Sequence, residues 1–201
     1  MVEKSLWTQQ VENNPEHSQW YIQRFKEMTA AGQDLHGEAR LVDAMVGRGA
    51  RVLDAGSGPG RVGGELARRG HTVVGVDVDP VLIEAAQADH PGATWITQDL
   101  AELDLAGAGI TGPFDVIVSA GNVMTFLAPS TRHTVLANLA GQLSGDGRLV
   151  VGFGAGRGYP FEEFFADARA AGLALDVALA TWDLRPWEPG SDFLVALLRR
   201  A

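Results

Sequence analysis

The sequence lacks cysteine altogether and contains only five histidines. Without cysteine the chain can form no disulfide bond, no thiolate metal site and no cysteine nucleophile. The histidines stand at positions 17, 36, 71, 90 and 133, a scatter that fits no pattern of metal-ligand spacing. We therefore expect no metal site in this protein.

Long apolar runs and an excess of basic residues are also missing. The longest apolar stretches have the length of a strand, far below the ~20 residues that a membrane-spanning helix needs. The first ten residues contain no apolar core typical of a signal peptide. The formal net charge of −9 argues against a broad nucleic-acid surface. We expect a cytoplasmic protein without membrane or nucleic-acid partners, and its oligomeric state stays open.

The composition that remains is that of a globular protein, with 46% hydrophobic and 20% charged residues among 201. Asn14 and Pro15 are typical of a helix start, and two helices are expected, over 15–32 and 37–46. Beyond them, strand and helix patterns alternate. Strands are expected over 51–54, 71–77, 94–98, 114–120, 148–153, 173–182 and 193–199, and helices over 61–69, 80–90, 129–143 and 160–171.

This alternation predicts an α/β fold with a seven-stranded, mostly parallel sheet and helices on both faces. The last strand is expected to be antiparallel, because residues 183–190 suit a hairpin loop and not a helix. We expect one domain over 1–201, with a helical cap at 1–49 and an α/β core at 50–201. The cap aromatics Trp20, Tyr21 and Phe25 either cover a crevice of this core or only pack against it.

The most informative segment reads Val-Leu-Asp-Ala-Gly-Ser-Gly-Pro-Gly, from Val52 to Gly60. A buried strand ends on Asp54, and glycines then follow at alternate positions. Because glycine has no side chain, a ligand can lie against bare peptide there. The adjacent carboxylate would repel a pyrophosphate but attract a cation or an amine.

Two further acids follow the next two strands. Asp77 ends the second strand, and Asp99 stands at the end of the third. The carboxyl ends of parallel strands line one crevice of the sheet, which is where ligands bind. Asp77 is placed to bind a ribose diol, and Asp99 to accept from an exocyclic amine. Together with Asp54, these acids describe a ligand with a cationic or amine end, a ribose and a purine.

These segments resemble the motifs of class I S-adenosylmethionine (SAM)-dependent methyltransferases. The glycine run is similar to the first motif of the family, and the resemblance continues in order over 74–77, 98–100, 114–120 and 193–198. It implies a Rossmann-like fold, SAM as the cofactor, and an enzyme that transfers a methyl group.

The resemblance also implies how the cofactor is bound. Asp54 would hold the amino group of the methionine part, Asp77 the ribose hydroxyls, and Asp99 the adenine amine. The other residues that it places at the cofactor or the transferable methyl group are Ala55, Gly56, Ser57, Gly58, Gly60, Val78, Leu100, Ser119, Ala120, Gly121 and Asn122.

The sequence indicates the residues that bind the methyl acceptor less clearly than those that bind the cofactor. Asn122 and Arg157 are the candidates for orienting the acceptor, although Asn122 also suits a turn and Arg157 a mobile loop. The segment 121–124 lacks the Asn-Pro-Pro-Tyr-like pattern of enzymes that methylate nucleobases, which favours a small-molecule acceptor. No residue is assigned as a general base.

Two other functions stay open at this point. Residues 58–63 match the G-x-G-x-x-G pattern of dinucleotide-binding proteins, which favours an NAD(P)-dependent oxidoreductase. Asp54 counts against this alternative, because it would lie beside a pyrophosphate. The missing base leaves a non-catalytic, SAM-binding regulatory module as the other alternative.

Overall fold

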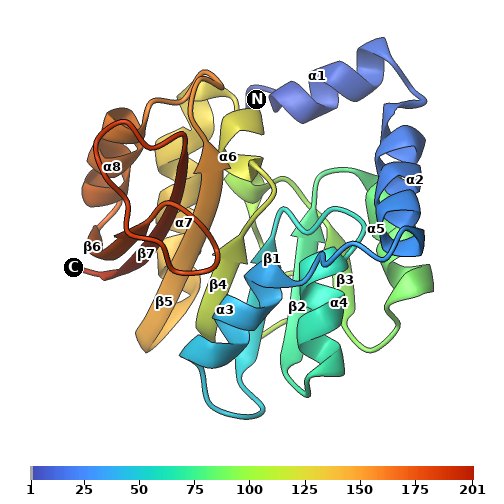
Figure 1. The fold of residues 1–201 in the computed structure, drawn as a ribbon, viewed down its shortest axis with the longest axis horizontal. Coiled ribbons are helices and arrows are strands. Elements are labelled where there is room, and N and C mark those ends of the chain that lie inside the picture. The colour runs from blue at the N-terminus through green and yellow to red at the C-terminus, as the bar shows by residue number, and fades with distance from the viewer. Residues whose placement is uncertain (1) are drawn as a thin grey trace.

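The computed structural model describes residues 2–201, and its centre is a seven-stranded sheet with the order β3-β2-β1-β4-β5-β7-β6 (Figure 1). The strands are β1 (Arg51–Ala55), β2 (Thr72–Asp77), β3 (Thr94–Thr97), β4 (Phe114–Ser119), β5 (Leu143–Gly154), β6 (Leu173–Leu179) and β7 (Phe193–Arg200). β1 to β5 pair in parallel, and β7 pairs antiparallel with both β5 and β6. The predicted α/β fold is therefore confirmed, including its antiparallel end.

Helices cover both faces of this sheet. They are α1 (Leu6–Asn13), α2 (His17–Ala30), α3 (Gly37–Met45), α4 (Arg61–Arg68), α5 (Pro80–Asp89), α6 (Val123–Phe126), α7 (Arg132–Gln142) and α8 (Phe161–Ala170), with two short 3₁₀ turns, η1 (Leu100–Glu102) and η2 (Pro129–Thr131). Figure 1 shows α3 and α4 in front of the sheet and α7 behind it. Among residues 2–201, no helix combines the length and apolar character that crossing a bilayer requires.

The alternation of side chains along β1 decides what each face receives. Leu53 and Ala55 enter the apolar cluster that includes α7 and α8, whereas Val52 enters the cluster on the side of α3 and α4. Successive side chains of a strand point to opposite faces. Asp54 therefore points to the same side as Val52, toward α4.

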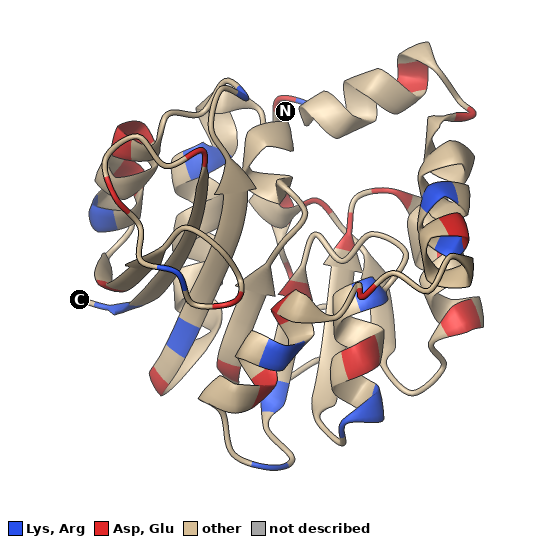
Figure 2. Cartoon of the chain, in the orientation of Figure 1, with Lys and Arg blue, Asp and Glu red and all other residues tan. Residues whose placement is uncertain are grey.

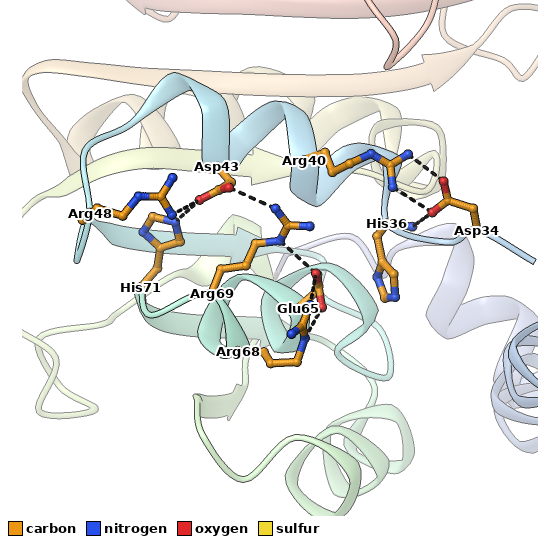
Figure 3. A network of polar contacts seen from close by, with 9 residues as sticks. All are labelled: Asp34, His36, Arg40, Asp43, Arg48, Glu65, Arg68, Arg69 and His71. Atoms are coloured by element: carbon orange, nitrogen blue, oxygen red, sulfur yellow. Dashed lines mark hydrogen bonds and ion pairs between the residues drawn. The ribbon is translucent and has the colours of Figure 1, made fainter.

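An ion-pair network joins α3 to α4 (Figure 3). Asp43 of α3 accepts hydrogen bonds from Arg48, Arg69 and His71. Glu65 of α4 accepts from Arg68 and Arg69, and these bonds lower the pKa of Glu65 to about 2. The network fixes the position of α3 against the core.

The N-terminal region differs from the prediction. Ser5 caps an unpredicted helix, α1, by accepting a hydrogen bond from the Thr8 amide. Asn14 follows the end of this helix, and α2 begins only at His17. The Asn-Pro pair thus lies in the turn between two helices, a place that these residue types suit equally well.

Two strand boundaries and one short helix in the core differ as well. The strand expected from 148 begins five residues earlier, at Leu143, and the register of β5 against β4 shifts between Phe114 and Val116. β6 ends at Leu179 and not at 182. The four-residue helix α6 was not expected, because one helical turn is too short to show a periodic pattern.

Close packing at Gly75 gives a test of the sheet. A Cβ atom built on Gly75 would lie 2.2 Å from two ring carbons of Trp95. We expect Gly75→Ala to lower the free energy of unfolding by about 1–3 kcal/mol, because the ring must move. Urea denaturation measures this change. Gly145→Ala, where nothing lies within 4 Å of the added carbon, is the control and should change stability by no more than ~0.5 kcal/mol. Equal effects of the two substitutions would contradict the packing described.

Candidate cofactor site

Asp54 lies at the carboxyl edge of the sheet with only 2% of its surface exposed. Its carboxylate accepts a hydrogen bond from the Gly63 amide of α4 at 2.7 Å. Burial raises the pKa of this carboxyl to about 7, against the opposing effect of the Gly63 N–H group. The side chain is therefore poised to ionise near neutral pH, and a neighbouring cation would favour the ionised form.

Asp77 ends the adjacent strand and is almost as deeply buried. One carboxylate oxygen accepts from the Gly58 amide at 2.8 Å, and the other from the Asp79 amide at 3.0 Å. Gly58 has a φ of 54°, a conformation that favours glycine. Burial raises the pKa of Asp77 to about 6. The carboxylate thereby fixes the glycine loop while facing a cavity.

Two cavities adjoin at this edge. The larger encloses about 610 Å³, solvent at its mouth included, and the smaller about 330 Å³ on the same measure. Asp77, Val78, Asp99 and Leu100 line the larger cavity, and Asp54 and Ser57 line the smaller. Both cavities are also bordered by the predicted residues Gly56, Gly58, Ala120 and Gly121.

Asp99 lines the larger cavity together with Leu100. One of its carboxylate oxygens accepts from the Ala101 amide at 2.9 Å and caps η1. The three predicted acids thus lie along one continuous edge, following β1, β2 and β3 in spatial order. Figure 2 shows acidic segments in the loops at this edge, below α1.

The other predicted residues lie outside the lining of both cavities. Ala55 is fully buried in β1, and Ser119 at the end of β4 is fully buried with no hydrogen-bond partner for its hydroxyl among the described residues. A Cβ atom on Gly60 would lie 2.9 Å from both His90 and Trp95. Gly60 therefore permits α4 to pack closely against its neighbours.

Asn122 and Arg157 both lie beside Gly154 at the end of β5. The Asn122 side-chain oxygen accepts from the Gly154 amide at 2.9 Å, and Asn122 has a φ of 68°. A Cβ atom on Gly154 would lie 3.2 Å from Nε of Arg157, a residue exposed to solvent. Asn122 thus joins the loop after β4 to β5, and Arg157 borders that junction.

Several residues that line the cavities escaped the sequence analysis. Ser5 and Trp7 of the N-terminal region contribute to the larger cavity, as do Val123, Phe126 and Leu127. Arg61, Pro59 and Val62 contribute to the smaller one. Pro59, Arg61 and Val62 occupy the variable positions of the G-x-G-x-x-G pattern at 58–63, which specify no residue type, and nothing in the residue types of the others marks them as ligand-binding.

Tyr21 of α2 lies over the junction of the two cavities and lines both. Its ring is 3.7 Å from a Cβ position on Gly58, and its hydroxyl 3.8 Å from one on Gly121. Burial raises the pKa of the Tyr21 hydroxyl. Phe25 borders the smaller cavity, whereas Trp20 is 55% exposed. Tyr21 and Phe25 therefore cover the crevice, and Trp20 does not.

Asp79 holds this cover in place. It caps α5 by accepting from the Val81 amide, as the following proline suggests. Its second carboxylate oxygen accepts from Nε1 of Trp7 at 2.9 Å and from the hydroxyl of Ser18 at 2.5 Å. One buried acid thereby joins α1 and α2 to the strand end that carries Asp77, and Figure 1 shows α1 crossing above that edge.

The residues that line the two cavities fit SAM as a ligand. Three acids line the cavities, and a carboxylate can accept hydrogen bonds from an ammonium group, from ribose hydroxyls or from a purine amine. Residues 2–201 include no group of three His, Asp or Glu side chains arranged to hold a metal ion. The fold and this edge define a nucleoside-binding α/β protein of the methyltransferase class.

Comparisons with known proteins agree with the assignment to the methyltransferase class. A family model described as a methyltransferase domain matches residues 52–147. The crystal structure of a TehB-like SAM-dependent methyltransferase from Corynebacterium glutamicum superposes with a TM-score of 0.89 and is 50% identical, over 94% of this chain and 100% of that one. The chain belongs to the SAM-dependent methyltransferases, and SAM is its cofactor.

Curated relatives of this chain are also methyltransferases. An uncharacterized methyltransferase of Mycobacterium tuberculosis is 36% identical over 121 residues, which is 59% of this chain and 57% of that protein. The magnesium-protoporphyrin O-methyltransferase of Rhodobacter capsulatus is 37% identical over 91 residues, or 45% and 39% of the two chains. The match thus spans little more than half of the first relative and less than half of the second. Membership of an enzyme family removes both the oxidoreductase and the non-catalytic alternatives.

The raised pKa of Asp54 predicts a pH dependence of stability. The folded carboxyl has a pKa of about 7, against 3.8 as its ordinary value. The folded state therefore binds the proton more tightly, and the free energy of unfolding falls as pH rises from about 4 to about 7. Glu65 has its pKa lowered from 4.5 to about 2, so its titration changes the free energy of unfolding only below about pH 4.5.

Chemical denaturation of the ligand-free protein at pH 5 and pH 8 measures this change. We expect Asp54→Asn to reduce the decline, while Asp77, with a pKa of about 6, still contributes to it. Asp146→Asn, at an exposed acid of β5, is the control and should decline as the wild type does. An Asp54→Asn protein with the wild-type decline would show that Asp54 does not titrate in this window.

Proposed function

We propose that this protein transfers the methyl group of SAM to a small-molecule acceptor, with residues 1–201 acting as one catalytic domain. The observation that carries the proposal is the cover of the crevice by Trp7, Tyr21 and Phe25. A folded macromolecule cannot insert an acceptor atom beneath α1 and α2 without displacing them, whereas a small molecule can.

The cofactor is proposed to lie along the acidic edge. Asp99 receives its adenine amine, Asp77 its ribose hydroxyls, and Asp54 its ammonium group. Gly56 and Gly58 allow it to lie against the loop, with Ser57, Val78, Leu100, Ala120 and Gly121 around it. These assignments are supported by the lining of the two cavities and by the burial of the acids.

The reaction needs little from the protein beyond positioning. Bound SAM supplies a methyl group that is activated by its sulfonium. The protein orients the two partners and excludes water from between them, which is the part we assign to Tyr21 and Trp7. Asn122 and Arg157 are the proposed residues for orienting the acceptor, because both lie beside Gly154, at the ends of β4 and β5. No side chain is assigned as a general base.

Asp77 gives the direct test of the cofactor assignment. We expect Asp77→Asn to weaken the binding of S-adenosylhomocysteine by roughly 10- to 100-fold, because a charged hydrogen-bond acceptor for the ribose is lost. Isothermal titration calorimetry measures the affinity.

The control for Asp77 is Asp115→Asn. Asp115 also accepts a hydrogen bond from a main-chain N–H group, that of Arg51, but it lies at the start of β4 and lines neither of the two cavities. It should leave the affinity unchanged. Wild-type affinity in Asp77→Asn would remove Asp77 from the proposed site.

The size of the acceptor can be tested separately. The enzyme is incubated with SAM labelled in its methyl group and a cell extract divided by a small-pore filter. We expect label to appear in the small-molecule fraction, and not with Asp77→Ala in place of the wild type. Label confined to protein or nucleic acid in the retained fraction would contradict a small-molecule acceptor.

A further inference from the structure

The two cavities join at a place that is marked by the residues lining both of them. These residues are Tyr21, Gly56, Gly58, Ala120 and Gly121. Four of them have no polar side-chain atom, whereas Tyr21 carries a hydroxyl. Within residues 2–201, Tyr21 therefore supplies the only side-chain functional group that is common to the two cavities.

The proposed cofactor site places the sulfonium at this junction. Asp54, which lines the smaller cavity, is assigned to the ammonium group, and Asp77, which lines the larger cavity, is assigned to the ribose. The sulfur atom of SAM joins the chain that carries the ammonium group to the ribose, so the methyl group on this sulfur lies between the two acids. The residues nearest to the methyl group are then those that line both cavities.

The Tyr21 side chain reaches two different loops at this edge of the sheet. One of its ring carbons lies 3.7 Å from a Cβ position on Gly58, in the loop after β1, and its hydroxyl oxygen lies 3.8 Å from one on Gly121, after β4. Gly121 directly precedes Asn122, which is proposed to orient the acceptor. The hydroxyl thus lies toward the end of β4, where the acceptor is expected to bind.

Two aromatic neighbours hold the Tyr21 ring in its orientation. Trp7 and Phe25 contact it edge-on, with their ring centres 5.2 and 5.0 Å from that of Tyr21, which is a geometry that aromatic pairs favour. Trp7 is itself held by a hydrogen bond to the Asp79 carboxylate. The hydroxyl therefore has a defined position before a ligand binds, which lowers the entropic cost of binding.

The Tyr21 hydroxyl is free to interact with a ligand. It has no hydrogen-bond partner within residues 2–201, whereas the hydroxyl of Tyr159, the other tyrosine of the chain, donates to Asp167 at 2.6 Å. Burial raises the pKa of the Tyr21 hydroxyl, so this group keeps its proton at neutral pH. A phenol is a much weaker nucleophile than a phenolate, and Tyr21 therefore does not compete with the acceptor for the methyl group.

We infer that the Tyr21 hydroxyl positions the methyl acceptor against the methyl group of SAM. The inference rests on the proposed function and adds to it a residue at the reacting atoms and a class of acceptor. The phenol oxygen accepts a hydrogen bond from an N–H or O–H group of the acceptor, which leaves a lone pair of that atom free to face the methyl carbon. Because S–H and C–H groups are weak hydrogen-bond donors, the acceptor is an amine or a hydroxyl compound.

The transfer balances with the groups already named. The lone pair of the acceptor nitrogen or oxygen forms the bond to the methyl carbon. The carbon–sulfur bond breaks with its electron pair left on sulfur, which gives S-adenosylhomocysteine, and the proton of the attacking atom passes to solvent water. Tyr21 keeps its own proton throughout and acts by orienting the acceptor.

Nuclear magnetic resonance tests the position of Tyr21 without an acceptor. SAM that is isotope-labelled in its methyl group is bound to protein with labelled tyrosine rings, and the nuclear Overhauser effect between the two labels is measured. Because the sequence has only two tyrosines, we expect a signal that disappears in Tyr21→Phe and remains in Tyr159→Phe. Bound SAM without this signal overturns the inference, whereas failure of SAM to bind overturns the proposed function.

Methyl transfer tests the role of the hydroxyl. The same labelled SAM is incubated with the small-molecule fraction of a cell extract. We expect Tyr21→Phe to slow the transfer of label roughly 10- to 100-fold, because the acceptor is no longer oriented. Its affinity for S-adenosylhomocysteine should change by less than about two-fold, since the hydroxyl is assigned to no group of that ligand. Wild-type transfer by Tyr21→Phe, or a loss of affinity as large as the loss of rate, overturns the inference.

The matched control is Tyr159→Phe, which removes the same atom from a residue that lines neither cavity. It should transfer label at close to the wild-type rate, and thermal unfolding checks that both variants are folded. The chemical shift of the transferred methyl group identifies the acceptor atom. A methyl group on nitrogen or oxygen is expected, and one on sulfur or carbon overturns the inference while the proposed function stands. The measurement of the Overhauser effect on the wild type decides the position of Tyr21 whether or not a variant folds.

Discussion

Asp54 and Asp77 are carboxylic acids that the fold keeps almost entirely out of contact with water, at the ends of two neighbouring strands. Main-chain N–H groups of Gly63, Gly58 and Asp79 hold them there. Burial without a cation raises both pKa values, to about 7 and about 6. A positively charged ligand reverses this effect, since it stabilises the ionised forms. The edge is thus built to gain electrostatic free energy when a cation enters.

The rest of the molecule is arranged around those two acids. The glycine loop is fixed by Asp77 through the Gly58 amide, and α4 approaches Asp54 closely because Gly63 has no side chain: a Cβ atom there would lie 2.9 Å from the carboxylate. On the outer side, Asp79 connects α1 and α2 to the same strand end. The cover and the floor of the crevice therefore depend on three acids, Asp54, Asp77 and Asp79, at the same edge of the sheet.

Much of this could be predicted from the sequence. The sheet follows from apolar runs that alternate with helical patterns, and the three acids were found because each ends a recognisable strand. The cover could not be predicted to the same degree. Trp7 is positioned at the cavity by a hydrogen bond to Asp79 and by ring contacts with Tyr21 and Phe126, all distant in the chain. The helix α6 is a single turn, so neither feature leaves a periodic signal in the sequence. Asn14 and Pro15 suit a helix start and a turn between two helices equally well, so the sequence does not distinguish the two.

In the candidate site, too, some residues could be predicted from the sequence and others could not. Residues at strand ends, such as Asp77 and Ala120, were predicted to face the ligand and do line the cavities. Gly60 shares the motif but packs against His90 and Trp95, because a glycine pattern does not say whether the space is needed by a ligand or by the protein. The place of Arg61 at the smaller cavity cannot be predicted in the same way, because Glu38 and Leu35, which hold its guanidinium, lie 23 and 26 residues away in the chain.

The claim that buried acids receive a cationic cofactor is tested most directly by the protons exchanged on binding. Calorimetric titration of the wild type with S-adenosylhomocysteine at pH 6.5, in two buffers with different ionisation enthalpies, gives this number. The ammonium group should lower the pKa of Asp54 from about 7, so binding should release protons, and Asp54→Asn should release fewer. Proton uptake, or equal exchange by the two proteins, would contradict the claim.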